Sequence, residues 1–396
     1  MPQTPFYANM VCELWDLVDG GIDDVLLRVK GEAGVNGITL TLAGGPVDRF
    51  RPQVGVTPRM FRSTAGAHFH PNADRYEATR LKPVAADWLR SRDPLPRVYE
   101  ACDRQGIRLR GRLTLGPALG QLHRHDESKL KNAYGEINPA WYCPVNPDVR
   151  ALYTAMVADV CDRQVCNKLE IMLRFPHASW TTGEAPAGFA GTNAAAWLLG
   201  LCFCESCRQQ AGNDDVNIDA ASHAARVLID AVRQPDETDP GMSLADLLGS
   251  DDALRQLHVW RQAQITTLAA ELIETASCDI WFARSNTPIN DNMDNRVIAD
   301  LAAGLIARCP CADRVEDIDA VVRRVCEETN DVRRTELRID LHGDQCDEGD
   351  ILVRCAQRAA GHGVAHMTFG DFGLLTTDRL DWVRRAVRFA SREMTS

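Results

Sequence analysis

Short apolar runs alternate with longer amphipathic segments along almost the whole chain. Strand-length runs occupy residues 7–13, 37–43, 108–115, 168–175, 278–286, 335–344 and 365–375, and a weaker run at residues 313–321 is sixth in chain order. Apolar positions at helical spacing separate these runs, and a last amphipathic segment closes the chain at residues 378–393. Eight strands that alternate with helices predict an α/β protein with a (β/α)8 TIM barrel, here as one domain over residues 1–396.

An open, doubly wound sheet is the alternative fold. It would usually have fewer strands, and neither GxGxxG nor GxxxxGK[ST] occurs where a nucleotide-binding fold would need it. The extra length of the chain falls in three segments, about 44–100, 116–147 and 176–250, and each follows the end of a predicted strand. In a barrel these would be long βα loops on the C-terminal face, where pockets form.

Several predicted strands carry charge on one face. The face opposite the leucine and isoleucine side chains holds Arg110 and Arg112 in one strand, Glu170 and Arg174 in another, and Glu336, Arg338, Asp340 and His342 in a third. Buried charges must be paired, so we expect the four arginines to pair with Glu170, Glu336 and Asp340 inside the barrel. Charges early in a strand would brace the barrel floor. Arg174, His342 and Asp371 come latest and are expected to contact substrate.

Composition and charge indicate which binding partners and which cellular compartment to expect. With 45% hydrophobic and 25% charged residues the chain can bury a core, and its net charge of −11 disfavours nucleic acid and anionic membranes. No apolar run approaches the roughly 18 residues of a membrane span. No signal peptide is visible, so we expect a cytoplasmic protein in which most of the 14 cysteines are reduced thiols.

Three cysteines crowd into the segment LCFCESC at residues 201–207. Cys202, Cys204 and Cys207 could supply three ligands of a tetrahedral structural zinc site. Cys143, in the segment after the third predicted strand, is the strongest candidate for the fourth ligand. A redox-active CxxC pair and unligated thiols stay open as alternatives, although a thioredoxin-like context is missing.

The combination of CPVNPDVR, a helix, a strand and then CFCESCR resembles the zinc-cysteine arrangement of the glycoside hydrolase family 42 β-galactosidases. The similarity covers residues 142–208. It implies a barrel, one structural zinc on Cys143, Cys202, Cys204 and Cys207, and a pocket for a carbohydrate substrate. Because relatives in that family often assemble as trimers, it also implies a homo-oligomer.

The chain departs from that family at the catalytic positions. The family places an Asn-Glu pair at the end of strand four and a nucleophilic Glu at the end of strand seven. Here the fourth strand ends Met172-Leu173-Arg174, and the seventh offers Asp340, His342 and Asp344. The acid/base pair of the family therefore does not carry over.

Glycoside hydrolysis usually requires two carboxyl groups that flank the scissile bond. We expect Asp340 and Asp371, on neighbouring strands, to form this pair, with Glu170 and His342 as further catalytic candidates. Other acids near strand ends are Asp317 and Asp319. Expected substrate contacts are Glu13, His68, His70, Arg174, Arg284 and Asn286.

Two further features leave alternatives open. The HxH pairs at residues 68–70 and 123–125 could hold a second, catalytic metal, although histidines in loops more often bind substrate or face solvent. Trp141, Trp180, Trp197 and Trp281 could stack on sugar rings or pack in the core.

Three functions fit these residues. The first is a carbohydrate-active hydrolase, most simply a glycosidase. The second is a non-hydrolytic sugar lyase or isomerase, which the missing Asn-Glu pair favours. The third is a catalytically silent barrel that binds glycan. The fold alone does not choose among them.

Overall fold

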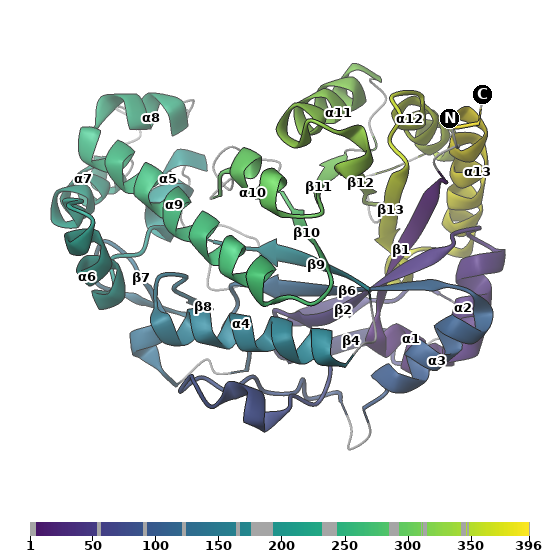
Figure 1. The fold of residues 1–396 in the computed structure, drawn as a ribbon, viewed down its shortest axis with the longest axis horizontal. Coiled ribbons are helices and arrows are strands. Elements are labelled where there is room, and N and C mark those ends of the chain that lie inside the picture. The colour runs from purple at the N-terminus through teal and green to yellow at the C-terminus, as the bar shows by residue number, and fades with distance from the viewer. Residues whose placement is uncertain are drawn as a thin grey trace.

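The computed structural model describes residues 5–53, 57–89, 93–120, 124–163, 167–175, 193–231, 244–284, 293–309, 311, 315–341, 346 and 348–395. Eight parallel strands close into a barrel, because the first strand pairs with both the second and the last (Figure 1). They are β1 (Tyr7–Glu13), β2 (Gly37–Gly44), β6 (Arg108–Leu115), β9 (Lys168–Leu173), β10 (Asp279–Ala283), β11 (Gly304–Cys309), β12 (Thr335–Ile339) and β13 (His366–Asp371). The predicted (β/α)8 TIM barrel is confirmed.

One predicted strand was wrong. Residues 313–321 do not form the sixth strand: from Val315 onward they belong to helix α11 (Val315–Thr329), and β11 takes that place in the barrel. Asp317 and Asp319 therefore lie on a helix, and Asp319 pairs with Arg358 and His362 at the end of α12 (Gly349–Gly361) rather than facing the barrel interior.

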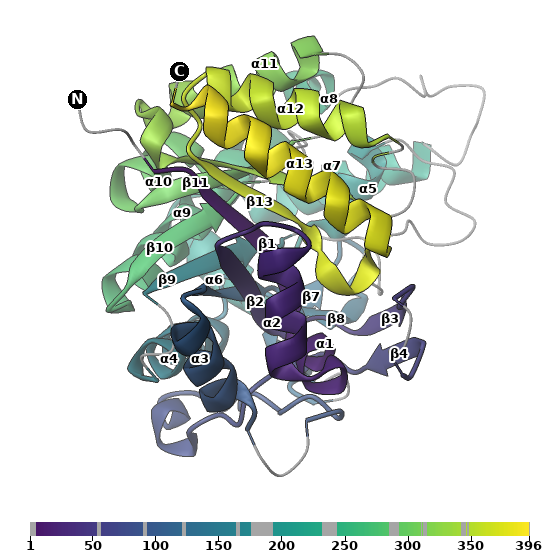
Figure 2. The ribbon, with the colours of Figure 1, turned by 90° about the vertical axis from the view of Figure 1, so that its right-hand side faces the viewer.

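Helices surround the barrel. Those that follow barrel strands directly or complete a βα unit are α1 (Leu14–Gly20), α2 (Ile22–Gly31), α3 (Leu95–Gln105), α4 (Pro147–Asp162), α9 (Asp252–Thr275), α10 (Asn295–Leu301), α11, α12 and α13 (Thr377–Glu393). Figure 2 shows α12 and α13 side by side against β13 and β1. The apolar strand faces, such as Leu337 and Ile339 of β12, join the main core between the barrel and these helices.

The long segments after β2, β6 and β9 contain additional elements. The first holds the hairpin β3 (Val47–Phe50) and β4 (Met60–Ser63), strand β5 (Gly66–Ala67) and the short helix η1 (Ala73–Tyr76). The second holds η2 (Asp126–Ser128) and the hairpin β7 (Lys129–Lys131) and β8 (Ile137–Tyr142). The third holds α5 (Asn193–Gly200), α6 (Glu205–Asn213), α7 (Ile218–Ala231) and α8 (Leu244–Ser250). Short helices η3 (Val332–Arg334) and η4 (Phe372–Leu374) flank β12 and β13.

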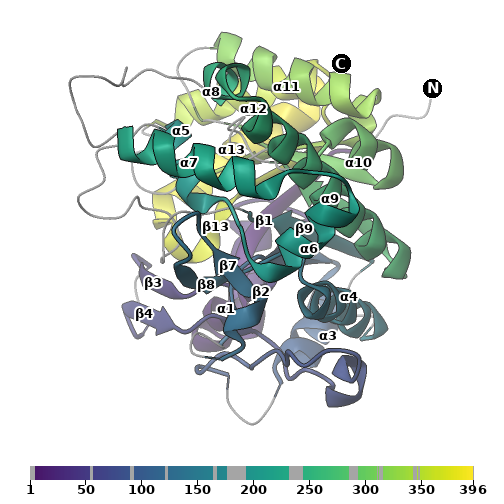
Figure 3. The same cartoon turned by 90° about the vertical axis from the view of Figure 1, so that its left-hand side faces the viewer.

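A second, smaller core lies beside the barrel, where the β7–β8 hairpin meets α5 to α8 and the start of α9 (Figure 3). Trp141 and Trp197 are buried in this core, at 1% and 2% exposure, so neither presents a face for sugar stacking. Trp281 instead points into the barrel and packs against His366. Trp180 lies outside the described residues.

The cysteines are mostly reduced, as expected. Cys311 and Cys346 form a disulfide, and the other eleven cysteines of the described ranges are thiols.

No helix of the described residues combines the length and the apolar character that crossing a membrane requires.

Candidate functional site

The floor of the barrel is a closed ion-pair network. The Arg110 guanidinium donates to both oxygens of Glu336, at 2.5 and 2.7 Å, and also to the hydroxyls of Thr39 and Thr368. Burial alone would raise the pKa of Glu336, but the charge and hydrogen bonds of Arg110 outweigh it and lower this pKa to about 2. Every polar atom of the pair is thus engaged, which indicates a structural role for this layer.

Aromatic side chains complete the floor. The His366 ring stacks on Tyr7, with 4.7 Å between ring centroids, and packs against Trp281. Lys168 places its ammonium group 3.5 Å from the centroid of Trp281. Burial lowers the pKa of His366 to about 4 and that of Lys168 to about 8. His366 is therefore neutral at physiological pH and acts as a packing residue.

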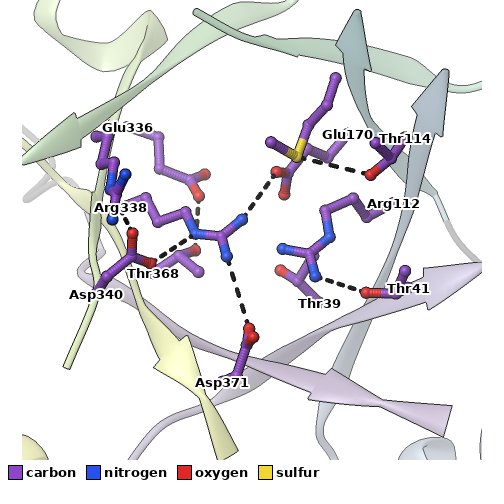
Figure 4. A network of polar contacts seen from close by, with 12 residues as sticks. Thr39, Thr41, Arg112, Thr114, Glu170, Glu336, Arg338, Asp340, Thr368 and Asp371 are labelled. Carbon is purple, nitrogen blue, oxygen red and sulfur yellow. Dashed lines mark hydrogen bonds and ion pairs between the residues drawn. The ribbon is translucent and has the colours of Figure 1, made fainter. Parts of the chain in front are cut away.

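Above the floor, one guanidinium joins three carboxylates. Arg338 of β12 donates to Asp340 at 3.2 Å and lies 3.7 Å from Glu170 and 3.6 Å from Asp371 (Figure 4). The three acids come from β9, from the end of β12 and from the end of β13. Their combined charge raises the pKa of Arg338 above its ordinary value despite burial, which opposes this. The predicted pairing with Glu170, Glu336 and Asp340 is therefore present for Arg110 and Arg338. It was wrong for the other two arginines among the described residues, because Arg112 pairs with Glu13 instead and Arg174 makes no ion pair.

The rim of the barrel brings further charges to the same place. Arg49, from the β3–β4 hairpin, donates to Asp371 at 2.8 Å and lies 3.5 Å from Glu13. Arg308, at the end of β11, contacts Asp340 at 2.5 Å. Glu13, Asp340 and Asp371 are 2%, 8% and 5% exposed, whereas the Arg308 side chain is 52% exposed, so solvent reaches the rim. We refer to Glu13, Glu170, Asp340 and Asp371 as the acid cluster.

Two charged groups at the acid cluster are incompletely paired. Arg112 donates to Thr41 at 2.5 Å and lies 3.4 Å from Glu13, but its Nε and Nη1 groups have no hydrogen-bond acceptor among the described residues. Neither oxygen of Glu170 accepts a hydrogen bond from the described part of the chain. Burial and the charge of Arg338 lower the pKa of Arg112. A dense set of charges with spare hydrogen-bonding capacity is typical of a functional site.

His68 and Arg174, both predicted substrate contacts, lie near this cluster. His68 is 1% exposed, and its Nδ1 contacts the carbonyl oxygen of Thr41 at 3.0 Å. Burial lowers the pKa of His68, so its ring is neutral beside Glu13. Arg174 follows β9 directly and is exposed at its surface. Desolvation, and after it the positive charges of nearby arginines, lower its pKa; these arginines are Arg338, Arg112 and Arg308.

Other predicted site residues lie elsewhere. Arg284 points to the helix layer, where it donates to Glu328 of α11 at 2.9 Å, because its position just after β10 alternates with the lumen-facing Trp281. The backbone of His70 is held by Asp93 and Arg163 beside α3 and α4. The structure thus does not bring these two residues to the acid cluster. His342 and Asn286 lie outside the described residues.

Sequence reasoning missed three charged residues near the site. Arg308 could have been found by placing a strand over Gly304–Cys309, whose alternation turns it inward with Ile306. No sequence pattern places Arg49 at the site, because it lies on a hairpin outside the barrel strands, 36 residues after Glu13. Asp16 was missed because it lies on α1. Burial and the charge of Glu13 raise its pKa to about 7 although Arg51 contacts it at 3.3 Å.

The four predicted metal ligands do come together. The Sγ atoms of Cys143, Cys202, Cys204 and Cys207 all lie within 4.8 Å of one another, and all four residues are buried. Zinc–sulfur bonds of about 2.3 Å in a tetrahedron place the sulfurs roughly 3.8 Å apart, so this cluster has the size of a metal site with four cysteine ligands. Hydrogen bonds from the other three thiols lower the pKa of Cys204, whereas hydrogen bonds within the cluster and burial raise the pKa values of Cys143 and Cys207.

Local structure explains how the cysteines meet. Cys143 follows β8, and its N–H donates to the carbonyl oxygen of Ser128 at 2.9 Å. Cys204 is the N-cap of α6 and Cys207 lies in its first turn, which turns two sulfurs to one side. The N–H of Phe203 donates to the carbonyl oxygen of Lys131 at 2.7 Å, so backbone contacts also join the two segments.

Comparisons with known proteins support the fold. No protein-family model matches the chain, and no curated protein matches its sequence. Among solved structures it is similar to α-L-fucosidase isoenzyme 2 from Paenibacillus thiaminolyticus, with a TM-score of 0.55 and 10% identity over 97% of this chain and 49% of that one. It is also similar to the β-galactosidase of the psychrophilic Marinomonas ef1, with a TM-score of 0.53 and 11% identity over 97% of this chain and 59% of that one. This chain thus spans about half the length of these proteins, and at such identities the similarity shows the fold alone, a (β/α)8 barrel.

Proposed function

We propose that this protein is a carbohydrate-active barrel enzyme, specifically a glycoside hydrolase that acts at the C-terminal ends of its strands. One observation carries the proposal: Glu13, Asp340 and Asp371 lie together at the C-terminal ends of β1, β12 and β13, where enzymes of this fold hold their active sites, and Glu170 of β9 lies below them on Arg338. The similarity to two glycosidase structures supports the same class of reaction.

Within the acid cluster, Asp340 and Asp371 are the proposed catalytic pair. Asp340 directly follows β12 and Asp371 ends the neighbouring strand β13, and Arg338 contacts both carboxylates. Arg49 and Arg308 also contact these two carboxylates from the rim, which would position them for the roles of nucleophile or general base. Glu170 is 1% exposed and lies between Arg110 and Arg338, so it would position these arginines. His342, two positions beyond Asp340, is the candidate proton donor.

A structural zinc on Cys143, Cys202, Cys204 and Cys207 is part of the proposal. It would join the segment after β6 to the segment after β9, and both segments border the catalytic end of the barrel. The proximity of the four buried sulfurs supports this assignment. The metal would shape the pocket and take no part in the reaction, because a site with four thiolates leaves zinc no open position.

A sugar lyase or isomerase is the second candidate. It is favoured by the ion pairs that arginines make with Asp340 and Asp371, since arginines could also stabilise a negatively charged intermediate. A lyase or isomerase would convert the sugar without adding water to a glycosidic bond.

The test is turnover against a broad panel of glycosides and oligosaccharides, with products identified by mass spectrometry. We expect a released sugar, and we expect Asp340→Asn and Asp371→Asn each to reduce its release by roughly 100-fold or more. Asp48→Asn, which removes an exposed carboxylate paired with Arg62, is the matched control and should retain full activity. Circular dichroism and thermal unfolding establish that each variant is folded.

The products separate the candidates. A sugar that gains water supports a hydrolase, whereas an unsaturated or isomerised product supports the second candidate. Glycoside turnover that survives both substitutions in folded protein contradicts the proposed catalytic pair. Glycan binding without turnover of any substrate would indicate a silent barrel.

A further inference from the structure

Among the described residues, arginines outnumber carboxylates at the mouth of the barrel. The four members of the acid cluster share this space with five arginines, which are Arg49, Arg112, Arg174, Arg308 and Arg338. Three of them are tied to Asp340 or Asp371 by ion pairs. Of the remaining two, Arg112 lies 3.4 Å from Glu13 but keeps unused donors, and Arg174 makes no ion pair with a described residue.

Arg112 has unused donors in a buried place. It is 5% exposed, and its Nε and Nη1 groups meet no acceptor among the described residues. Its Nη2 group is engaged by Thr41 and Glu13. Leaving N–H donors of a buried cation unsatisfied is costly, unless a ligand accepts from them.

No carboxylate of the described residues pairs with Arg174. It makes no ion pair with any residue in the described ranges, and the charges it experiences are those of Arg338, Arg112 and Arg308. All are positive, and together with desolvation they lower its pKa. Arg174 lies four positions after Glu170 and so on the same, inward face of β9, at the C-terminal end of the barrel. An incoming anion would relieve the repulsion among these cations.

The positive charge at the barrel mouth contrasts with the rest of the protein. The whole chain carries a net charge of −11, so its surface as a whole repels anions. A positive mouth on an acidic protein would concentrate negative charge at one place. Guanidinium groups offer a planar pair of donors, which matches the geometry of carboxylate, sulfate and phosphate groups.

We propose that the substrate of this barrel is an anionic sugar, whose carboxylate, sulfate or phosphate group is bound by Arg112 and Arg174. The inference rests on the proposed function, in that it takes the mouth of the barrel as the substrate site. It identifies the class of substrate, and it assigns Arg112 and Arg174 to binding rather than to the catalytic step.

Binding, measured apart from turnover, tests the inference. The probes are D-glucuronate, D-galacturonate, glucose 6-sulfate and glucose 6-phosphate, with D-glucose as the neutral reference, each titrated into the full chain by calorimetry. We expect at least one anionic sugar to bind with at least about tenfold higher affinity than glucose, and we expect added salt to lower this affinity. The anion that binds best distinguishes a carboxylate from a sulfate or phosphate.

Variants locate the contact. Arg174→Gln, at an exposed position that should fold normally, is expected to weaken binding of the preferred anion about tenfold and leave glucose binding unchanged. Arg174→Lys should restore part of the affinity. Arg388→Gln, an exposed arginine on α13, is the matched control and should bind like the wild type. Arg112→Gln should weaken the anion as well, provided that circular dichroism shows it folded.

The outcomes are distinct from those of the proposed function. Anionic sugars that bind no better than glucose, or an Arg174→Gln variant with unchanged affinity, overturn the inference even if neutral glycosides are hydrolysed. Tight, Arg174-dependent binding of an anion without any hydrolysis supports the inference and contradicts the hydrolase.

Discussion

Asp16 is a buried carboxylate whose charge the fold opposes. It lies about one turn beyond Glu13, at 5% exposure, and burial together with the charge of Glu13 raises its pKa from 3.8 to about 7. The folded protein therefore binds a proton at Asp16 between about pH 4 and pH 7 that the unfolded chain has already released. Stability contributed by the neutral acid is present below this window and is lost as the pH rises through it.

The stability of an Asp16→Asn variant should therefore depend less on pH than that of the wild type. The variant cannot ionise, so its stability relative to the wild type should increase from pH 5 to pH 8 by about 2–3 kcal/mol, because about two of the roughly three pKa units of the shift lie in this range. Urea unfolding at both pH values measures the difference. Asp48→Asn, at an exposed position, should show no such change. A difference between Asp16→Asn and the wild type that does not vary with pH would contradict the raised pKa.

The charged lumen shows what single residues reveal in a sequence. Alternation along a strand was enough to predict that Arg110, Glu170, Glu336 and Arg338 face inward and pair, because the period of a strand is fixed at two. The partners of each charge were not predictable from one strand. Arg49 reaches Asp371 across 322 residues of chain, and only the closed barrel brings them together.

Among the elements, seven barrel strands were predictable because apolar runs of strand length mark them. The sixth, β11, was not. The segment LAAGLIARC continues the apolar spacing of α10, so the boundary between helix and strand is hidden, whereas DRVEDIDAV imitates a strand although it begins an amphipathic helix. Packing decides here: Leu305 and Ala307 of β11 are buried in the main core, and Gly304 lies against Trp281.

Gly304 offers a test of how tightly β11 is held. A Cβ atom at this position would lie 2.5 Å from the carbonyl oxygen of Arg334 and 2.6 Å from the ring of Trp281. Since backbone cannot yield easily, we expect Gly304→Ala to reduce the free energy of unfolding by about 1–3 kcal/mol, measured by urea denaturation. Gly212→Ala, on α6, would meet no atom within 4 Å and should not destabilise. Equal stability of both variants would show that the barrel adapts at β11.

At the scale of the whole molecule, the chain builds two separate cores, and the cysteine cluster joins two segments of the smaller one. The barrel core and the smaller core around α5 to α8 each bury their own residues, and the four cysteines belong to the smaller one. Asn146 adds to the connection, because it caps α4 and donates to Ser206 of α6 at 3.1 Å. A metal bound here would hold the helical segment against the β7–β8 hairpin and so fix one side of the barrel mouth.

Zinc removal tests this arrangement. We expect protein purified without chelator to contain one zinc per chain by elemental analysis, and Cys207→Ser to contain none and to unfold at lower temperature. The loss should be large, because binding of structural zinc contributes roughly 10 kcal/mol or more of free energy to ordering its ligands. Cys326→Ser, on α11 and outside the cluster, keeps all four ligands and should retain both zinc and stability. A zinc content well below one per chain in the wild type would contradict the metal site, and the smaller core would then hold the helical segment by apolar packing alone.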